Sequence, residues 1–306
     1  MSGGYRDFGD FLREHFTGKV QKISINAGFT CPNRDGTKGR GGCTYCNNVT
    51  FNPDYCNPVK RVAEQLEEGR RFFARKYPEM RYLAYFQAYT NTYGDIDHVC
   101  RLYDEALATP GVVGLVIGTR PDCMPDGLLG YLSSLRRKGT FVLVEYGVET
   151  WRNDTLHIIN RCHTWKESAD AITRTAAAGV LTGAHVIAGL PGEDGGDVAE
   201  TARHLSQLPL DTVKLHQLQL IRGTRLAEQV ERGELQVPRW TVDEYIDVCL
   251  GFISHLSPTI AIERFTSQSP DNLLISPRWG LKNYQFTALL HRAIVSRGVA
   301  QGDALQ

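Results

Sequence analysis

The sequence lacks the features that would assign it at once to a membrane or to a polyanionic partner. Its formal net charge is zero, because 34 basic residues balance 34 acidic ones, so no overall field attracts nucleic acid or an anionic membrane. It contains no apolar run long enough to cross a bilayer, no low-complexity stretch and no block of like charge. Any polyanion must therefore be bound by a local patch of cations.

A secretion signal is also lacking, since the opening MSGGYRDFGD has no cationic start followed by an apolar stretch. We therefore expect a cytoplasmic protein whose 8 cysteines stay reduced and form no disulfides. With 42% apolar residues among 306, the chain can bury a large core. No linker forces a division into two domains.

Three of the cysteines are grouped, with no fourth partner at matching spacing. Cys43 and Cys46 are separated by two residues, and Cys31 joins them across the glycine-rich loop 32–42. Thiolates at such spacing bind soft metals, and three ligands on a four-iron cluster leave one iron open to a small molecule. The loop has no large apolar side chain, so it can wrap around a cofactor. The pattern predicts an iron–sulfur centre.

A structural zinc site is the alternative to that centre. Zinc normally takes four ligands, and the nearest spare cysteine, Cys56, lies ten residues beyond Cys46 without a companion. The spacing therefore favours iron, with Cys56 outside the ligand set. The remaining cysteines are expected to be packed or incidental thiols: Cys100, Cys123, Cys162 and Cys249.

Short β-branched runs alternate with helical patterns along the chain. The runs lie at 19–26, 82–86, 112–118, 141–147, 180–189 and 212–220. Six strands at intervals of roughly 30 residues, each followed by a helix, predict βα units in a parallel sheet. Because a closed barrel of this kind needs eight units, we expect an α/β fold, a partial (β/α)6 barrel. The expected parts are an N-terminal segment 1–18, a core barrel 19–224 and a C-terminal helical extension 225–306 that closes the barrel.

Glycine-rich and polar motifs follow the predicted strands. After the cysteine loop they read FQAYTNTYGD, GTRPDCMPD, GVETWRNDTLHIINRCHT, GLPGED and QLIRGTRLAE. Reactive groups in parallel α/β sheets sit at the carboxyl ends of the strands, so these motifs predict one site at one mouth of the barrel. Two histidines, His185 and His216, alternate within strands and could point into the barrel, either as core residues or as proton carriers.

These motifs, in this order, resemble the radical S-adenosylmethionine (SAM) enzymes over nearly the full length of the chain. Within that family the sequence is similar to the branch with a long first cysteine spacing that includes the elongator catalytic subunit, and it resembles a small bacterial group of radical proteins more closely. The resemblance rests on AGFTCPNRDGTKGRGGC, FQAYTNTY, GTRPDC, VEYGVET, INRCHT, GLPGED, KLHQL and RFTSQSPDNLLISPRWGLKN. It implies a radical SAM barrel, a [4Fe-4S] cluster held by the three cysteines, and SAM as cofactor.

The resemblance also implies roles around SAM. Tyr45 would lie against the adenine, Glu149 would bond the ribose hydroxyls, and Arg161 would meet the SAM carboxylate. Gly189 and Pro191 belong to the motif that borders the adenine. Taken singly, each has a structural alternative: a helix cap for the arginine, a surface ion pair for the glutamate, and an ordinary turn for GLPGED.

Two stretches depart from the family pattern. Where relatives use a Gly-Gly-Glu run to bind the methionine amino group, this chain offers Gln87, Thr90 and Asn91. Gly118 replaces a glutamate that relatives have before the TRPD sequence. We therefore expect the ligand of the methionine amino group to be one of Gln87, Thr90 and Asn91.

The implied function is reductive cleavage of SAM to a 5′-deoxyadenosyl radical that acts on a modified uridine of tRNA, at the anticodon wobble position. A flavodoxin or ferredoxin would supply the electron. Two alternatives stay open at this point. One is a radical SAM enzyme acting on a small metabolite or peptide, and the other is an iron–sulfur electron-transfer or carrier protein without a substrate of its own.

The C-terminal segment offers candidate substrate contacts. Residues 262–298 contain five basic and two acidic side chains, interleaved with aromatic rings. Cations beside rings that stack a splayed base suit a single-stranded RNA loop, so Arg264, Arg278, Trp279 and Lys282 are the candidate RNA contacts. Alternatively the segment closes the barrel and its rings are core; the two interpretations are compatible.

Overall fold

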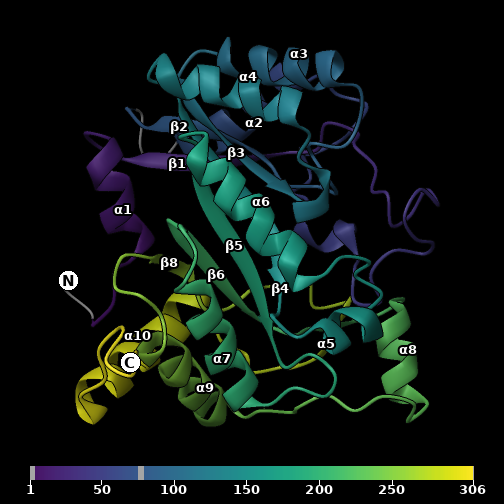
Figure 1. The fold of residues 1–306 in the computed structure, drawn as a ribbon, viewed down its shortest axis with the longest axis vertical. Helices are drawn as coiled ribbons and strands as arrows, with labels where there is room; N and C mark the ends of the chain where they lie inside the picture. Colours follow the sequence, from purple (N-terminus) through teal and green to yellow (C-terminus); the bar gives the residue numbers. More distant parts are fainter. Residues whose placement is uncertain (1–3, 75–78, 306) are drawn as a thin grey trace.

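A curved sheet of parallel strands forms the centre of the molecule (Figure 1), with the order β1-β2-β3-β4-β5-β6-β8. The computed structural model describes residues 4–74 and 79–305, so residues 1–3 of the expected N-terminal segment lie outside the described part. The strands are β1 (Val20–Ile25), β2 (Arg81–Phe86), β3 (Val112–Thr119), β4 (Phe141–Glu149), β5 (Leu181–Ala188), β6 (Thr212–Gln217) and β8 (Ala261–Arg264). The predicted partial α/β barrel is confirmed.

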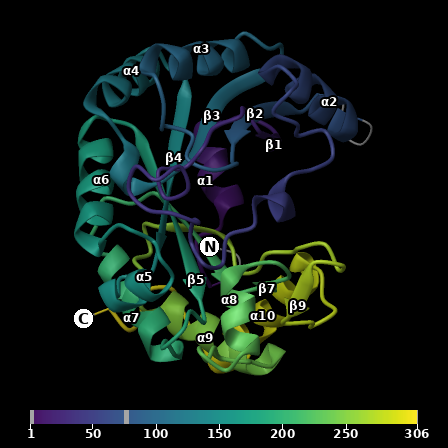
Figure 2. The same ribbon diagram turned by 90° about the vertical axis from the view of Figure 1, so that its right-hand side faces the viewer.

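Helices surround the sheet, and α2, α3, α4 and α6 form an arc along its outer side in Figure 2. The α-helices are α1 (Phe8–His15), α2 (Val62–Ala74), α3 (Ile96–Leu107), α4 (Asp126–Arg137), α5 (Asn153–Ile158), α6 (Trp165–Ala177), α7 (Gly195–Leu205), α8 (Arg225–Glu231), α9 (Val242–Ser254) and α10 (Asn283–Arg297). Short elements are the 3₁₀ turns η1 (Asn48–Phe51) and η2 (Pro121–Cys123) and the antiparallel pair β7 (Leu220–Ile221) and β9 (Leu274–Ser276). Among the described helices, none has the length and apolar character needed to span a membrane.

The sheet has one strand more than the sequence predicts. Strand β8 lies in the segment expected to be helical and pairs in parallel with β6, from Thr212 opposite Ala261 to Lys214 opposite Arg264. Its AIER sequence is four residues long and half charged, so it lacks the apolar run by which the other strands are recognised. The C-terminal segment therefore supplies one strand of the curved sheet.

Helix α1 closes the amino-terminal end of the barrel. Its Phe11 is 2% exposed and packs in a cluster with inward residues of the sheet, among them Val116, Phe141 and Leu143. Asp7 caps this helix by accepting from the backbone N–H of Asp10 at 2.6 Å. The amino-terminal end of the barrel is thus filled by a packed apolar layer, and a cavity opens at the carboxyl ends of the strands.

A layer of four charges lies above this apolar plug. Lys22 of β1 donates to Glu145 of β4 at 2.8 Å and to Glu263 of β8 at 2.5 Å, and Lys214 of β6 lies 2.5 and 3.4 Å from the same two carboxylates. Burial alone would raise the pKa of Glu145, but Lys214 and then Lys22 outweigh it and hold that pKa well below its usual range. A Cβ on Gly183 would lie 3.2 Å from the Glu145 side chain, so a glycine keeps space for it. These ion pairs, the charge layer, join the two edge strands of the open sheet.

Glu145→Gln should lower the free energy of unfolding by about 3–5 kcal/mol, because it removes one charge from a buried, paired set while keeping the side-chain volume. Urea unfolding of the purified protein measures this. The matched control is Glu200→Gln, which removes a carboxylate from a half-exposed i,i+3 pair with Arg203 and should cost about 0–1 kcal/mol. Equal costs for the two variants would contradict a structural role for the charge layer.

Candidate active site

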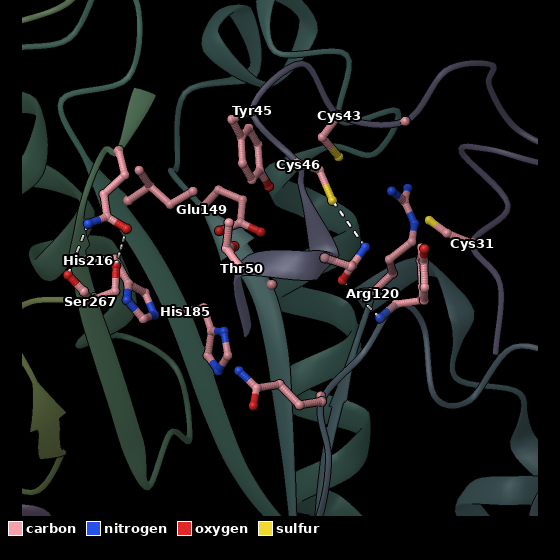
Figure 3. A pocket seen from close by; sticks show the side chains of 18 of the residues that line it. Cys31, Cys43, Tyr45, Cys46, Thr50, Arg120, Glu149, His185, His216 and Ser267 are labelled. Atoms are coloured by element: carbon pink, nitrogen blue, oxygen red, sulfur yellow. Dashed lines mark hydrogen bonds between the residues drawn. The ribbon is translucent and has the colours of Figure 1, made fainter. Parts of the chain in front are cut away.

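One cavity opens at the carboxyl ends of the strands and brings together most of the motifs found in the sequence. In Figure 3 the cysteines lie at one side of it and His216 and Ser267 at the opposite side, with Glu149 between them. Its lining comes from the cysteine loop, from the ends of β2, β3, β4, β5 and β6, and from the segment after β8. The site therefore spans the barrel from its first strand to its last.

The three predicted ligand thiols all line this cavity. Cys43 receives hydrogen bonds from Asn33 Nδ2 and Arg161 Nη1, each at 3.5 Å, and Cys46 from Asn48 Nδ2 at 3.4 Å. In the described part of the chain they share a wall without forming a compact group of three metal-ligating side chains. These N–H groups are donors that a thiolate sulfur can accept.

Backbone hydrogen bonds hold the cysteine loop in place, since it has no core of its own. The N–H of Thr44 donates to Ile159 at 3.0 Å, and the Thr44 carbonyl accepts from Leu226, the second residue of α8, at 2.8 Å. The Gly42 carbonyl accepts from Asn160 Nδ2 at 2.8 Å and from Arg225 at 3.2 Å. The loop is thus fastened to the segment after α5 and to α8, which lie more than a hundred residues further along the chain.

Glu149 and Arg161 form an ion pair of 3.3 Å at the cavity wall. The Arg161 guanidinium also donates to the Gly147 carbonyl at 2.6 Å, and a Cβ on Gly147 would lie 2.4 Å from it, so only glycine allows this approach. The Arg161 Nε is buried and has no hydrogen-bond partner in the structure. A buried donor without a partner is costly, which indicates that a ligand acceptor belongs beside it.

Left-handed backbone conformations place this pair. Glu149 ends β4 with φ of 69°, after a register shift in the β4–β5 ladder, and Asn160 and Cys162 on either side of Arg161 have φ of 53° and 57°. Non-glycine residues rarely adopt such angles, and they gather at functional sites where the surroundings impose them. Here they turn the glutamate and the arginine toward the cavity.

The other residues that the sequence assigns to SAM lie in different surroundings in the structure. Tyr45, Gln87 and Thr90 line the cavity. Asn91 is fully buried and donates to the backbone carbonyls of Phe86 and Gly118 at 3.1 and 2.7 Å, so its amide serves the strand ends. Gly189 lines a second, neighbouring cavity, and Pro191 is buried without lining either one.

That second cavity adjoins the first, because Gln217 and Leu218 line both. Its walls come from α8, the segment 237–241 and the segment 275–279. The cations and rings that line it are Arg222, Arg239, Arg278, Trp240 and Trp279, facing two carboxylates, Glu228 and Glu231. We call this surface the arginine–tryptophan groove.

The candidate RNA contacts in the tail are likewise separated. Arg264, at the end of β8, lines the first cavity, whereas Arg278 and Trp279 line the groove. The Arg278 side chain donates to backbone carbonyls of its own loop, including Ile275 at 3.3 Å. Trp279 stacks on Phe286 at 5.9 Å, consistent with the packing alternative, and Lys282 caps the start of α10 away from both cavities.

Comparison with protein families identifies the chain. A model of the Radical SAM superfamily matches residues 29–205, and a Radical_SAM C-terminal domain model matches residues 210–295. The chain belongs to the Radical SAM superfamily. The resemblance seen in the sequence is confirmed, and this protein is a radical SAM enzyme.

Similar proteins agree with the assignment. The protein YtqA of Bacillus subtilis is 32% identical over 302 residues, which is 99% of this chain and 93% of that protein. A tRNA uridine(34) acetyltransferase of Methanocaldococcus jannaschii is 25% identical over 190 residues, 61% of this chain and 34% of that enzyme. The solved structure of Methanocaldococcus infernus Elp3 superposes with a TM-score of 0.67 at 17% identity, covering 94% of this chain and 65% of that one, and so shares the fold.

Radical SAM enzymes bind a [4Fe-4S] cluster and SAM, and the cavity fits both. Burial, followed by the nearby Cys43, raises the pKa of Cys46 to about 12, so this thiol needs a cationic partner to ionise. Iron supplies that charge. The partnerless Arg161 Nε offers a hydrogen-bond donor to an anionic ligand. The donor set therefore suits a cluster with one iron left open to a ligand.

Several lining residues of this radical SAM cavity were not found from the sequence. Tyr85 and Glu145 face it from β2 and β4, and Gln217 and Ser267 join β6 to the segment after β8 through paired amide and backbone hydrogen bonds of 2.9 Å. Single polar residues at alternate positions of apolar strands were the available signal, because that period of two marks the inward face of a barrel.

Replacing Cys31, Cys43 or Cys46 by Ala should abolish the brown iron–sulfur chromophore after anaerobic reconstitution, if these three residues are the cluster ligands that the sequence predicts. Visible absorption and iron content measure the effect. Cys56→Ala is the matched control and should keep the cluster, because the Cys56 thiol is buried and donates to the Ser24 carbonyl at 3.0 Å. Loss of iron in that control would show four-cysteine ligation instead.

Proposed function

We propose that this enzyme cleaves SAM reductively and uses the resulting radical on a modified uridine of tRNA. The observation that supports it best is the adjacency of two surfaces: a cavity with three thiols and a carboxylate–guanidinium pair, next to a groove of arginines and tryptophans. The bound cluster and SAM together supply a 5′-deoxyadenosyl radical able to abstract hydrogen. The protein's part is to orient the reactants and exclude water.

On this proposal, Cys31, Cys43 and Cys46 hold the cluster, and the residues around them hold SAM. Arg161 meets the SAM carboxylate through its partnerless Nε, and Glu149, fixed by the same arginine, accepts from the ribose hydroxyls. Tyr45 lies against the adenine. Gln87 and Thr90, which line the cavity, bind the methionine amino group.

The electron for cleavage comes from a one-electron donor protein such as a flavodoxin or ferredoxin. Radical SAM chemistry requires a reductant, and the cysteine loop is the natural point of delivery. Arg34, Asp35 and Lys38 in that loop belong to its partly or fully exposed portion. A donor approaching there is separated from the substrate, which enters from the opposite side of the cavity.

The groove supports an RNA substrate. Arginines contact phosphates, and aromatic rings stack unpaired bases, which is how single-stranded RNA loops are bound. Trp240 already packs against backbone, since a Cβ on Gly189 would lie 3.1 Å from its ring. The shared lining by Gln217 and Leu218 gives a nucleotide a short route from the groove into the reactive cavity. The tRNA uridine(34) acetyltransferase similarity supports the same substrate class.

Arg161→Gln should weaken SAM binding by about 1.5–3 kcal/mol, because a charge-assisted contact to the carboxylate is lost. Anaerobic titration of the reconstituted enzyme with SAM measures the affinity, and the parent should release 5′-deoxyadenosine when reduced. The matched control is Arg101→Gln on the exposed face of α3, which should bind SAM as the parent does. Unchanged affinity in Arg161→Gln would remove this arginine from the SAM site.

Arg222→Glu with Arg239→Glu should weaken tRNA binding and reduce the slope of log affinity against log salt by about 1.4–1.8, the value for two lost phosphate contacts. Cleavage of SAM without tRNA should stay intact. These arginines are preferred to Arg278, whose side chain is engaged by its own loop. Fluorescence anisotropy over a salt series gives the affinities.

The charge-matched control for this pair is Arg101→Glu with Lys138→Glu, two exposed positions on the outer helical layer. It should bind tRNA like the parent. If the parent itself does not bind tRNA but releases 5′-deoxyadenosine, a small metabolite or peptide becomes the substrate. If it releases none, the electron-transfer interpretation takes its place.

A further inference from the structure

Two arginines that line the reactive cavity each have a buried Nε without a hydrogen-bond partner. They are Arg161, beside Glu149, and Arg264, at the end of β8. Arg264 lies next to His216, whose label in Figure 3 is across the cavity from the cysteines. A buried guanidinium N–H without an acceptor costs free energy, so each position calls for an acceptor from a ligand.

The charge of Arg264 is not balanced within the described part of the chain. Lys22 and Lys214 are neutralised by the two glutamates of the charge layer. Arg120 pairs with Asp122 at 2.9 Å, and Arg161 pairs with its glutamate. Arg264 has no ion pair among residues 4–74 and 79–305, although its neighbour across the ladder is the cation Lys214.

Arg34 also lines the cavity without an ion pair in those residues, but it belongs to the cluster side. It stands three residues after Cys31, and its guanidinium lies over the Tyr89 ring at 5.6 Å. Its charge therefore belongs to the side of the cavity formed by the cysteine loop. Arg264 faces the opposite part of the cavity, and the carboxylate of its neighbour Glu263 is already paired with both lysines of the charge layer.

The contact of Arg264 with His216 does not supply the negative charge that the arginine lacks. Its Nη2 lies 3.4 Å from His216 Nε2, and because an arginine can only donate, that nitrogen is the acceptor and the proton sits on Nδ1. Burial, followed by the charge of Arg264, lowers the pKa of His216 well below its usual value, so the ring is neutral. His216 orients the Arg264 guanidinium through Nη2, and the Nε of Arg264 remains without an acceptor.

We infer that Arg264, oriented by His216, forms a subsite for an anionic group of the substrate. This rests on the proposed function: SAM has one carboxylate, which Arg161 binds, so the acceptor at Arg264 belongs to the second reactant. Carboxylate and phosphate oxygens share the required chemistry, a charged acceptor for a planar guanidinium. The reacting substrate is therefore an acidic molecule, or a nucleotide whose phosphate or acidic substituent reaches into the barrel.

The charge layer explains why the subsite has this position. Glu145 and Glu263 are each held by both lysines. Neither the carboxylate of Glu145, three strands from Arg264, nor that of Glu263, next to it in sequence, is left to pair with the arginine. The interior thus has a neutral floor, and Arg264, without an ion pair in the described part of the chain, lies above it on the side away from the cysteine loop. An anionic group bound there would place the substrate opposite the cysteines.

The test uses reconstituted enzyme saturated with SAM, titrated anaerobically by calorimetry with four probes: acetate, inorganic phosphate, uridine and uridine 5′-monophosphate. The parent should bind at least one anionic probe. Arg264→Gln should weaken that binding about tenfold or more, Arg264→Lys should retain part of it, and Arg101→Gln should match the parent. Uridine, which has no charge, should be unaffected by Arg264→Gln.

The probes identify the source of the anion. Preference for phosphate and the nucleotide assigns a phosphoryl group, and preference for acetate assigns a carboxylate. Equal affinity of the parent and Arg264→Gln, or no anion binding by the parent, overturns the inference. Loss of SAM affinity in Arg264→Gln also overturns it, because the arginine would then serve the cofactor. Failure of the proposed function is a separate result, seen as a parent that does not release 5′-deoxyadenosine.

Discussion

The charge layer is the interaction on which the rest of the site depends. An open sheet has two free edges, and here Lys22 on the first strand and Glu263 on the last are joined across the interior at 2.5 Å. Such buried pairs add little net stability over apolar packing, but they are costly to break and so define geometry. The cysteine loop follows β1, and Arg264 ends β8. The ion pairs of the charge layer therefore fix how far the cysteine loop lies from Arg264 across the cavity.

The second constraint is the fastening of a loop that has no core. Thr44 is held through its N–H by the segment after α5 and through its carbonyl by α8. The segment after α5 also presents Arg161 to the cavity between two left-handed residues. The segment after α5 thus holds the cysteine loop and also supplies the Arg161 guanidinium beside Glu149. The positions of the cysteines and of that guanidinium are therefore linked.

Much of this architecture could be predicted from the sequence, and the failures have physical causes. The six longer strands were found because each has a short apolar or β-branched run, and the cysteines because their close spacing is typical of metal ligands. Strand β8 was missed because half of its four residues are charged and face the interior. The side chain of Arg278 is held by backbone carbonyls of its own loop, and Gly189 lines the groove because of where β5 ends. Neither contact can be predicted from the order of apolar and polar residues along the sequence.

The apolar plug formed by Phe11 has a kinetic consequence. With the amino-terminal end of the barrel filled, cofactor and substrate share the mouth at the carboxyl ends of the strands. The thiols and Arg161 lie against the walls of that cavity, and the groove joins it from the side through Gln217. A large substrate seated over the mouth blocks exchange of whatever lies beneath it. If the proposed tRNA substrate occupies that position, SAM must bind before it and 5′-deoxyadenosine must leave after it.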